Sequence, residues 1–161
     1  MGLSQPALFK RFGTKRELML QSLMSPVNDA WFTSLGGPAD PDTPARDQLQ
    51  QRMQLLLAFF LKQAPAIGVL KASGIDLHEV LAGFDEAPPV RVRRELAEWM
   101  QRMHQAGLFA RAPFDSLALV LMASIQGRVM LEHVANMSVP PDYLDDVLDL
   151  FWRRLAPEES P

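Results

Sequence analysis

Histidines are the first residues to consider for chemistry in this chain, because it contains no cysteine. His78, His104 and His133 show neither the i, i+4 pairing nor the His–Cys spacing of a metal site. No glycine-rich phosphate loop is present, and Ser73 and Ser124 lack the sequence context of a nucleophile. The carboxylates are spread over charged stretches, without an apolar-flanked pair for acid–base work. We therefore expect no metal, no cofactor and no enzymatic activity.

Basic and aromatic residues are concentrated at the N-terminus instead, in the segment GLSQPALFKRFGTKREL at residues 2–18. Residues 1–24 carry four basic side chains and one acidic one, a net charge of +3. Residues 25–161 carry twelve basic and eighteen acidic side chains, a net charge of −6. This asymmetry favours a polyanionic partner at the N-terminal end, and a solvated basic helix face is the alternative.

The same segment has the signals of two consecutive helices. Ser4 is a good N-cap for a first helix that runs to about Phe12, and Gly13 ends it. Thr14 and Glu17 have the spacing of a capping box, which starts a second helix. The basic residues are therefore expected on a tight helix pair.

Helical periodicity continues through the rest of the chain, and the alternation typical of strands is absent, so we predict an all-α fold. Residues 36–44, rich in Gly, Pro and Asp, are the clearest linker. A long helix follows, which Pro65 is expected to end or bend. Residues 66–87 predict one or two short helices. The next helix is expected to start at Pro88 and to close at Gly107.

The last two helices are predicted from Phe114 to about Ala135 and after Pro140, and both are apolar on more than one face. A helix that is apolar all round has to be covered all round. This favours a homodimer through a four-helix bundle between subunits, and the alternative is that earlier helices cover both faces. The predicted dimer-interface residues are Leu119, Ala123, Gly127, Met130, Val134, Tyr143, Val147, Leu150 and Phe151.

Residues 2–18 resemble the end of the helix-turn-helix in the tetracycline-repressor (TetR/AcrR) family of bacterial transcription regulators. The positions that carry the resemblance are Gly2, Leu3, Ser4, Leu8, Phe12, Thr14, Lys15 and Leu18. The resemblance implies a DNA-binding remnant at residues 1–24, comprising the recognition helix and the start of the connecting helix. It also implies an antiparallel helical body for ligand binding and dimerisation at residues 25–161.

The recognition helix implied by this resemblance presents its N-terminal residues to the major groove. Gln5 could bind an adenine there, and Lys10 and Lys15 would neutralise phosphates. Phe9 departs from the Tyr of the family pattern and lacks its hydroxyl, which suggests a packing or apolar role. The predicted DNA-binding residues are Ser4, Gln5, Pro6, Ala7, Phe9, Lys10 and Lys15.

The first two helices of the family's DNA-binding domain should precede Gly2, and they include the helix that packs across the recognition helix. Without them, Leu3, Leu8 and Phe12 lose their cover. We therefore expect the full-length protein to bind DNA and this chain alone to bind it poorly. A mis-assigned start at Met1, a truncated form and a genuine N-terminus all stay open.

The resemblance further implies that the body binds a small apolar effector, which changes the spacing of two DNA-binding heads. Large, adaptable apolar side chains could line its pocket, with His104 and Gln126 as polar anchors, and plain core positions are the alternative. The predicted ligand-binding residues are Trp31, Phe59, Phe60, Trp99, Met100, Met103, His104, Met122 and Gln126.

No uninterrupted apolar run reaches the length of a membrane span, and the N-terminus does not read as a signal peptide. We expect a cytoplasmic protein without a membrane partner. Two functions follow. The first is a DNA-binding, ligand-responsive repressor that acts as a homodimer. The second is a helical dimerisation or small-molecule-binding module without DNA binding.

Overall fold

The computed structural model describes residues 29–157. Seven residues within this range lie outside the description: Ser73, Ile75, Leu77, Glu79, Val80, Gly83 and Val134. For residues 66–71 the description covers the backbone alone. The described part of the chain is helical and contains no strand, which confirms the all-α prediction. The predicted head, residues 1–24, lies outside the described residues.

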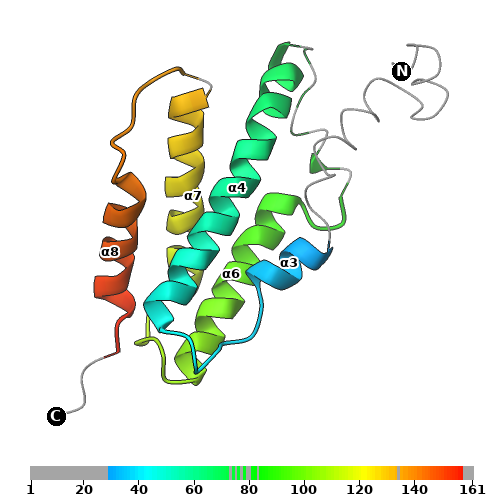
Figure 1. Cartoon of the computed structure of the whole chain (residues 1–161). Helices are drawn as coiled ribbons and strands as arrows, with labels where there is room; N and C mark the ends of the chain where they lie inside the picture. Colours follow the sequence, from blue (N-terminus) through cyan, green and yellow to red (C-terminus); the bar gives the residue numbers. More distant parts are fainter. Residues whose placement is uncertain are drawn as a thin grey trace, which may run out of the picture.

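The described helices are α3 (Asp29–Leu35), α4 (Ala45–Ala72), α6 (Pro88–Gln105), α7 (Phe114–His133) and α8 (Tyr143–Leu155). Successive helices from α4 to α8 run in alternating directions, and α3 is a short helix against α6 (Figure 1). α7 contacts α4, α6 and α8, so it is the helix around which the others pack.

Proline and glycine set the ends of α6 as the sequence predicts. Pro88 and Pro89 occupy its first turn, where the missing N–H groups would have no partner within the helix. At the other end Gly107 has a φ of +76°, which a residue with a side chain adopts only with strain. Its amide binds the carbonyl of His104 at 2.9 Å, which closes the last turn.

α4 continues through Pro65, so this proline does not end the helix. Proline cannot donate to the carbonyl of Leu61, and its ring crowds that carbonyl. Both residues are exposed, so water can reach the freed carbonyl. Residues 66–72, which were expected to belong to a separate short helix, are therefore the last two turns of α4.

The linker between α3 and α4 is held by one buried glutamine. Gln48 is 3% exposed, and its side-chain amide donates to the carbonyls of Asp40 at 2.6 Å and Thr43 at 2.8 Å. The amide of Asp40 in turn donates to Oε1 of Gln48 at 3.1 Å. Three hydrogen bonds thus satisfy one buried polar side chain and fix the path of residues 36–44.

α7 contributes to the core with one face only. Its buried residues are Phe114, Ala118, Leu121, Met122, Ile125 and Val129. Within the described part of the chain, α7 is the one helix long and apolar enough to cross a membrane, judged by length and composition. Because α7 is not an unbroken apolar run, its sequence does not by itself indicate a membrane span. Core helices of helical bundles have the same composition.

Candidate functional site

The predicted DNA-binding residues cannot be placed, because Ser4, Gln5, Pro6, Ala7, Phe9, Lys10 and Lys15 all lie outside the described residues. The first described element after the predicted head is α3. The contacts of α3 with the other helices are therefore the described contacts nearest in sequence to the predicted head.

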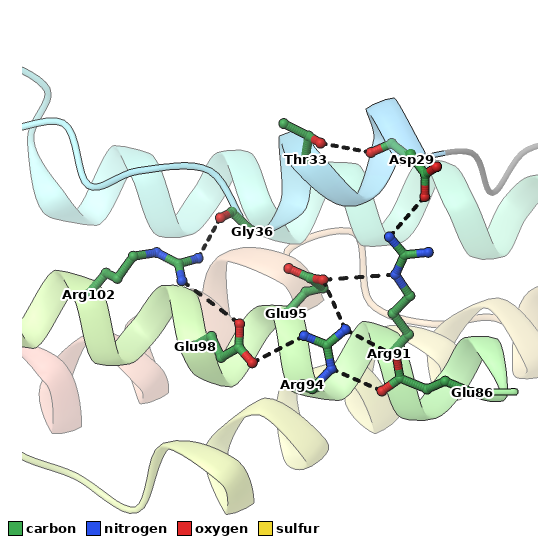
Figure 2. Close-up of polar contacts among 9 residues, drawn as sticks. All are labelled: Asp29, Thr33, Gly36, Glu86, Arg91, Arg94, Glu95, Glu98 and Arg102. Carbon is green, nitrogen blue, oxygen red and sulfur yellow. Dashed lines mark hydrogen bonds and ion pairs between the residues drawn. The ribbon is translucent and has the colours of Figure 1, made fainter.

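Two arginines of α6 fasten α3 and the turn that follows it (Figure 2). Nη2 of Arg91 lies 3.0 Å from Oδ1 of Asp29. The guanidinium carbon of Arg91 lies 3.9 Å from the centroid of the Phe32 ring, within the range of a cation–π contact. About three turns further along α6, Arg102 donates a hydrogen bond to the carbonyl of Gly36. α3 is thus held at both of its ends.

Gly36 lies so close to α6 that a side chain there would have to displace the end of the Glu95 side chain. A Cβ atom at this position would collide with the carboxylate of Glu95. That carboxylate is only 18% exposed, and Oε1 lies 3.2 Å from Nη2 of Arg94 and 3.9 Å from Nε of Arg91. The missing side chain at Gly36 therefore allows a partly buried, doubly paired acid beneath the end of α3.

Arg94 is the centre of a chain of ion pairs along α6 (Figure 2). It binds both oxygens of Glu86 at 3.0 Å, in the forked geometry that guanidinium groups favour, and it binds Glu98 at 3.1 Å. The hydrogen bond from Arg94 lowers the pKa of the Glu86 carboxyl, and the two acids raise the pKa of Arg94. These groups are solvated, so the network orients side chains more than it stabilises the fold.

Most of the predicted ligand-binding residues meet in one hydrophobic core. Six of them are at most 8% exposed: Phe59, Phe60, Trp99, Met100, Met103 and Met122. Trp31 is half-buried, and its ring centroid lies 4.8 Å from that of Phe59. The ring of Trp99 packs edge-on against Phe109 at 5.5 Å. The sequence thus identified side chains that lie together, and their packing alone accounts for their types.

The two predicted polar anchors have different surroundings. Nδ1 of His104 lies 2.9 Å from the carbonyl of Phe109, so this ring nitrogen is already engaged with the turn after α6. Gln126 is half-buried on α7. A surface depression of about 360 Å³ lies between α6 and the start of α7, and its walls are polar. None of the predicted ligand-binding residues lines it; its lining residues are Arg94, Ala97, Glu98, Gln101, Ala112, Phe114 and Asp115.

Arg52 on α4 is a candidate residue that the sequence reading missed. Its guanidinium carbon lies 5.0 Å from the centroid of the Trp99 ring, and its Nε is buried without a hydrogen-bond partner. Burial lowers the pKa of Arg52, and the charge of Arg102 lowers it further. A signal was present, because Arg52 occupies the helical stripe that Leu49 and Leu56 bury, where a cation is out of place.

The predicted dimer-interface residues divide by exposure. Leu119 and Leu150 are 49% and 63% exposed, unusually open for leucines. Ala123 is exposed, whereas Gly127, Met130 and Tyr143 are half-buried, and Val134 lies outside the described residues. Val147 and Phe151 are each 6% exposed, because α8 turns them toward α4 and α7. Those two side chains are part of the core of their own chain and offer little surface to a partner.

One apolar stripe on α7 faces away from the core, and we call it the outer stripe. Its members are Leu119, Val120, Ala123, Gly127 and Leu131. They follow one another at helical spacing, so they form a continuous surface. A Cβ atom added at Gly127 would meet nothing within 4 Å, which leaves the middle of the stripe open. The outer stripe and the buried face together explain the all-round apolar pattern of this helix.

Among the described residues, no group of three or more His, Asp or Glu side chains is arranged to hold a metal ion. No family model matches the chain, and neither the curated proteins nor the solved structures include a significant match to it. The functional assignment therefore depends on the residues and the geometry themselves.

Proposed function

We propose that this protein is a DNA-binding transcription regulator of the TetR type, a ligand-responsive repressor that acts as a homodimer in the cytoplasm. The observation that carries the proposal is the helix-turn-helix pattern of residues 2–18, in which identity, spacing and a capping box agree. The all-α body that follows is compatible with it.

A second copy of the chain is the partner proposed for the outer stripe. Exposed apolar surface of this extent on one helix is typical of an interface. Ala123 and the open space above Gly127 let another helix approach closely in the middle of the stripe. A twofold dimer brings the same stripe from each copy together, and it places two DNA-binding heads on one duplex.

The proposed control uses the contacts between α3 and α6. α3 follows the head in the chain, and Arg91 and Arg102 tie it to α6. An effector that favours one position of α6 therefore also favours one position of α3 and one spacing of the heads. The effector contacts proposed on α6 are those of Trp99, Met100 and Met103, which belong to the hydrophobic core.

Selection from a random DNA library tests the DNA-binding proposal. We expect the chain, and more strongly a form extended by the codons upstream of Met1, to enrich a sequence with two symmetric half-sites. Gln5→Ala should relax the preference at one base pair of each half-site. Lys10→Ala should weaken binding to all sequences alike and reduce its salt dependence, whereas the matched change Lys62→Ala on α4 should do neither. The proposal fails if neither form enriches any sequence.

A helical dimerisation or small-molecule-binding module without DNA binding is the second candidate. It is favoured by the continuous hydrophobic core that the described residues form. Translation of the genomic DNA upstream of the Met1 codon separates the two candidates. Two encoded amphipathic helices in frame support the regulator, and a stop codon close upstream supports the module.

A further inference from the structure

Two hydrogen-bond donors without partners belong to one pair of stacked side chains. Trp99 is 0% exposed, and its indole Nε1 has no hydrogen-bond partner. Arg52 lies over its ring, and Nε of that guanidinium is also buried and unpaired. Buried donors are nearly always bonded, so two unpaired donors on neighbouring side chains call for an explanation.

A negative acceptor would suit the Arg52 cation better than a neutral one. Arg52 makes no ion pair with any carboxylate of the described residues. Burial lowers the pKa of Arg52, and the charge of a second cation, Arg102, lowers it further. A half-buried cation that has a like charge nearby and no counter-charge is costly, and an anion would relieve that cost.

The acids on this side of α6 are already engaged elsewhere. Glu98 lies 4.0 Å from Arg102 but binds Arg94 more closely, at 3.1 Å. Glu95 is paired with Arg94 and Arg91. Positive charge is therefore left in excess where α4, α6 and the turn after α3 meet.

Gly37 in that turn lies next to the guanidinium. A Cβ atom at Gly37 would lie 3.4 Å from Nη2 of Arg52, so the backbone of the turn and the guanidinium are close neighbours. Glycine here adds no side chain beside the guanidinium.

We propose that Arg52 and Arg102 form a binding site for the oxyanion of a small molecule, a carboxylate or a phosphate. The planar, forked donors of guanidinium groups match both anions, and Trp99 offers one further N–H. The effector of the proposed regulator would then carry an acidic group on its apolar body. Only this link to DNA rests on the proposed function, because the site itself does not need a DNA-binding head.

Thermal unfolding in the presence of inorganic phosphate or acetate tests the site. The ionic strength is held constant with sodium chloride, and no DNA is present. We expect at least one of the two anions to raise the Tm of the wild-type chain in a saturable way. Arg52→Met keeps an unbranched apolar side chain and removes the charge, and it should weaken the apparent affinity at least about tenfold. Arg153→Met, the same change at an exposed position on α8, should leave the response intact.

Thermal unfolding in sodium chloride alone gives a second, independent expectation. Without phosphate or acetate, Arg52→Met should unfold at the same or a higher Tm than the wild type, because it removes an unpaired charge. A response to phosphate alone identifies a phosphate ligand, and a response to acetate alone identifies a carboxylate. The proposal is overturned if neither anion acts beyond chloride, if Arg52→Met responds like the wild type, or if Arg52→Met is strongly destabilised in chloride. Failure on any of these grounds leaves the DNA-selection experiment unaffected.

Discussion

The guanidinium group of Arg91 lies 3.9 Å from the ring centroid of Phe32, a residue that is buried in the contact between α3 and α6. The same cation binds Asp29 at the first turn of α3. One side chain of α6 thus holds a short helix through an aromatic face and a carboxylate. A helix of this length is not stable alone in water, so its position depends on such contacts.

Replacing Arg91 with alanine should loosen α3. We expect Arg91→Ala to lower the free energy of unfolding by about 1–2 kcal/mol, from the lost cation–π contact and the packing of the arginine stem. Urea unfolding measures the change. Arg111→Ala, at an exposed position outside the helices, is the matched control and should change stability by less than about 0.5 kcal/mol. Equal losses in both variants would show that Arg91 does not hold α3.

Gly36 and Glu95 should behave as a coupled pair. Gly36→Ala places a methyl group against Oε2 of Glu95, so the carboxylate that pairs with Arg91 and Arg94 through Oε1 must shift. We expect a loss of about 1–2 kcal/mol in urea unfolding. In a Glu95→Ala background the carboxylate is absent, and the cost of Gly36→Ala should fall by at least about 0.5 kcal/mol. Additive costs would contradict the close approach.

The pairing of Glu86 with Arg94 should appear in the pH dependence of stability. Arg94 lowers the pKa of the Glu86 carboxyl in the folded chain below its ordinary value of 4.5. The stabilisation is therefore fully present above pH 4.5 and is lost as the pH falls through the lowered pKa. Glu86→Gln should lower the Tm at pH 7, and its Tm should approach that of the wild type in acid. A difference that is constant over the whole pH range would rule out this linkage.

The helices were predictable because their signals are local. Pro88 and Gly107 mark the ends of α6, and the Gly- and Pro-rich residues 36–44 mark the linker. Pro65 shows the limit of this reasoning. A proline inside a helix costs one hydrogen bond, and whether the chain accepts that cost depends on packing along the whole of α4.

The contacts of the candidate sites were not predictable, because they join residues far apart in sequence. Arg91 meets Asp29 across 62 positions, and only the fold decides which of several acids it binds. Arg52 could have been noticed as a cation on an apolar stripe. Its neighbour Trp99 and the second cation, Arg102, follow only once α4 and α6 lie together.

The outer stripe of α7 should be required for dimerisation and not for folding. Leu119 is 49% exposed in the single chain, so Leu119→Lys should leave the stability of the protomer within about 0.5 kcal/mol. In the proposed dimer the same change buries an unpaired charge, and light scattering should then report a mass close to one chain. Leu61→Lys is the matched control, with 38% exposure on α4, and it should remain dimeric.

A core substitution separates loss of folding from loss of association at the same helix. Leu121 is 0% exposed on the opposite face of α7, and Leu121→Ala should cost about 2–5 kcal/mol in urea unfolding. At temperatures where it stays folded, this variant should still form the dimer, because its outer stripe is intact. A wild-type chain that is monomeric at micromolar concentration, or a Leu119→Lys variant that remains dimeric, would show that the outer stripe has another role.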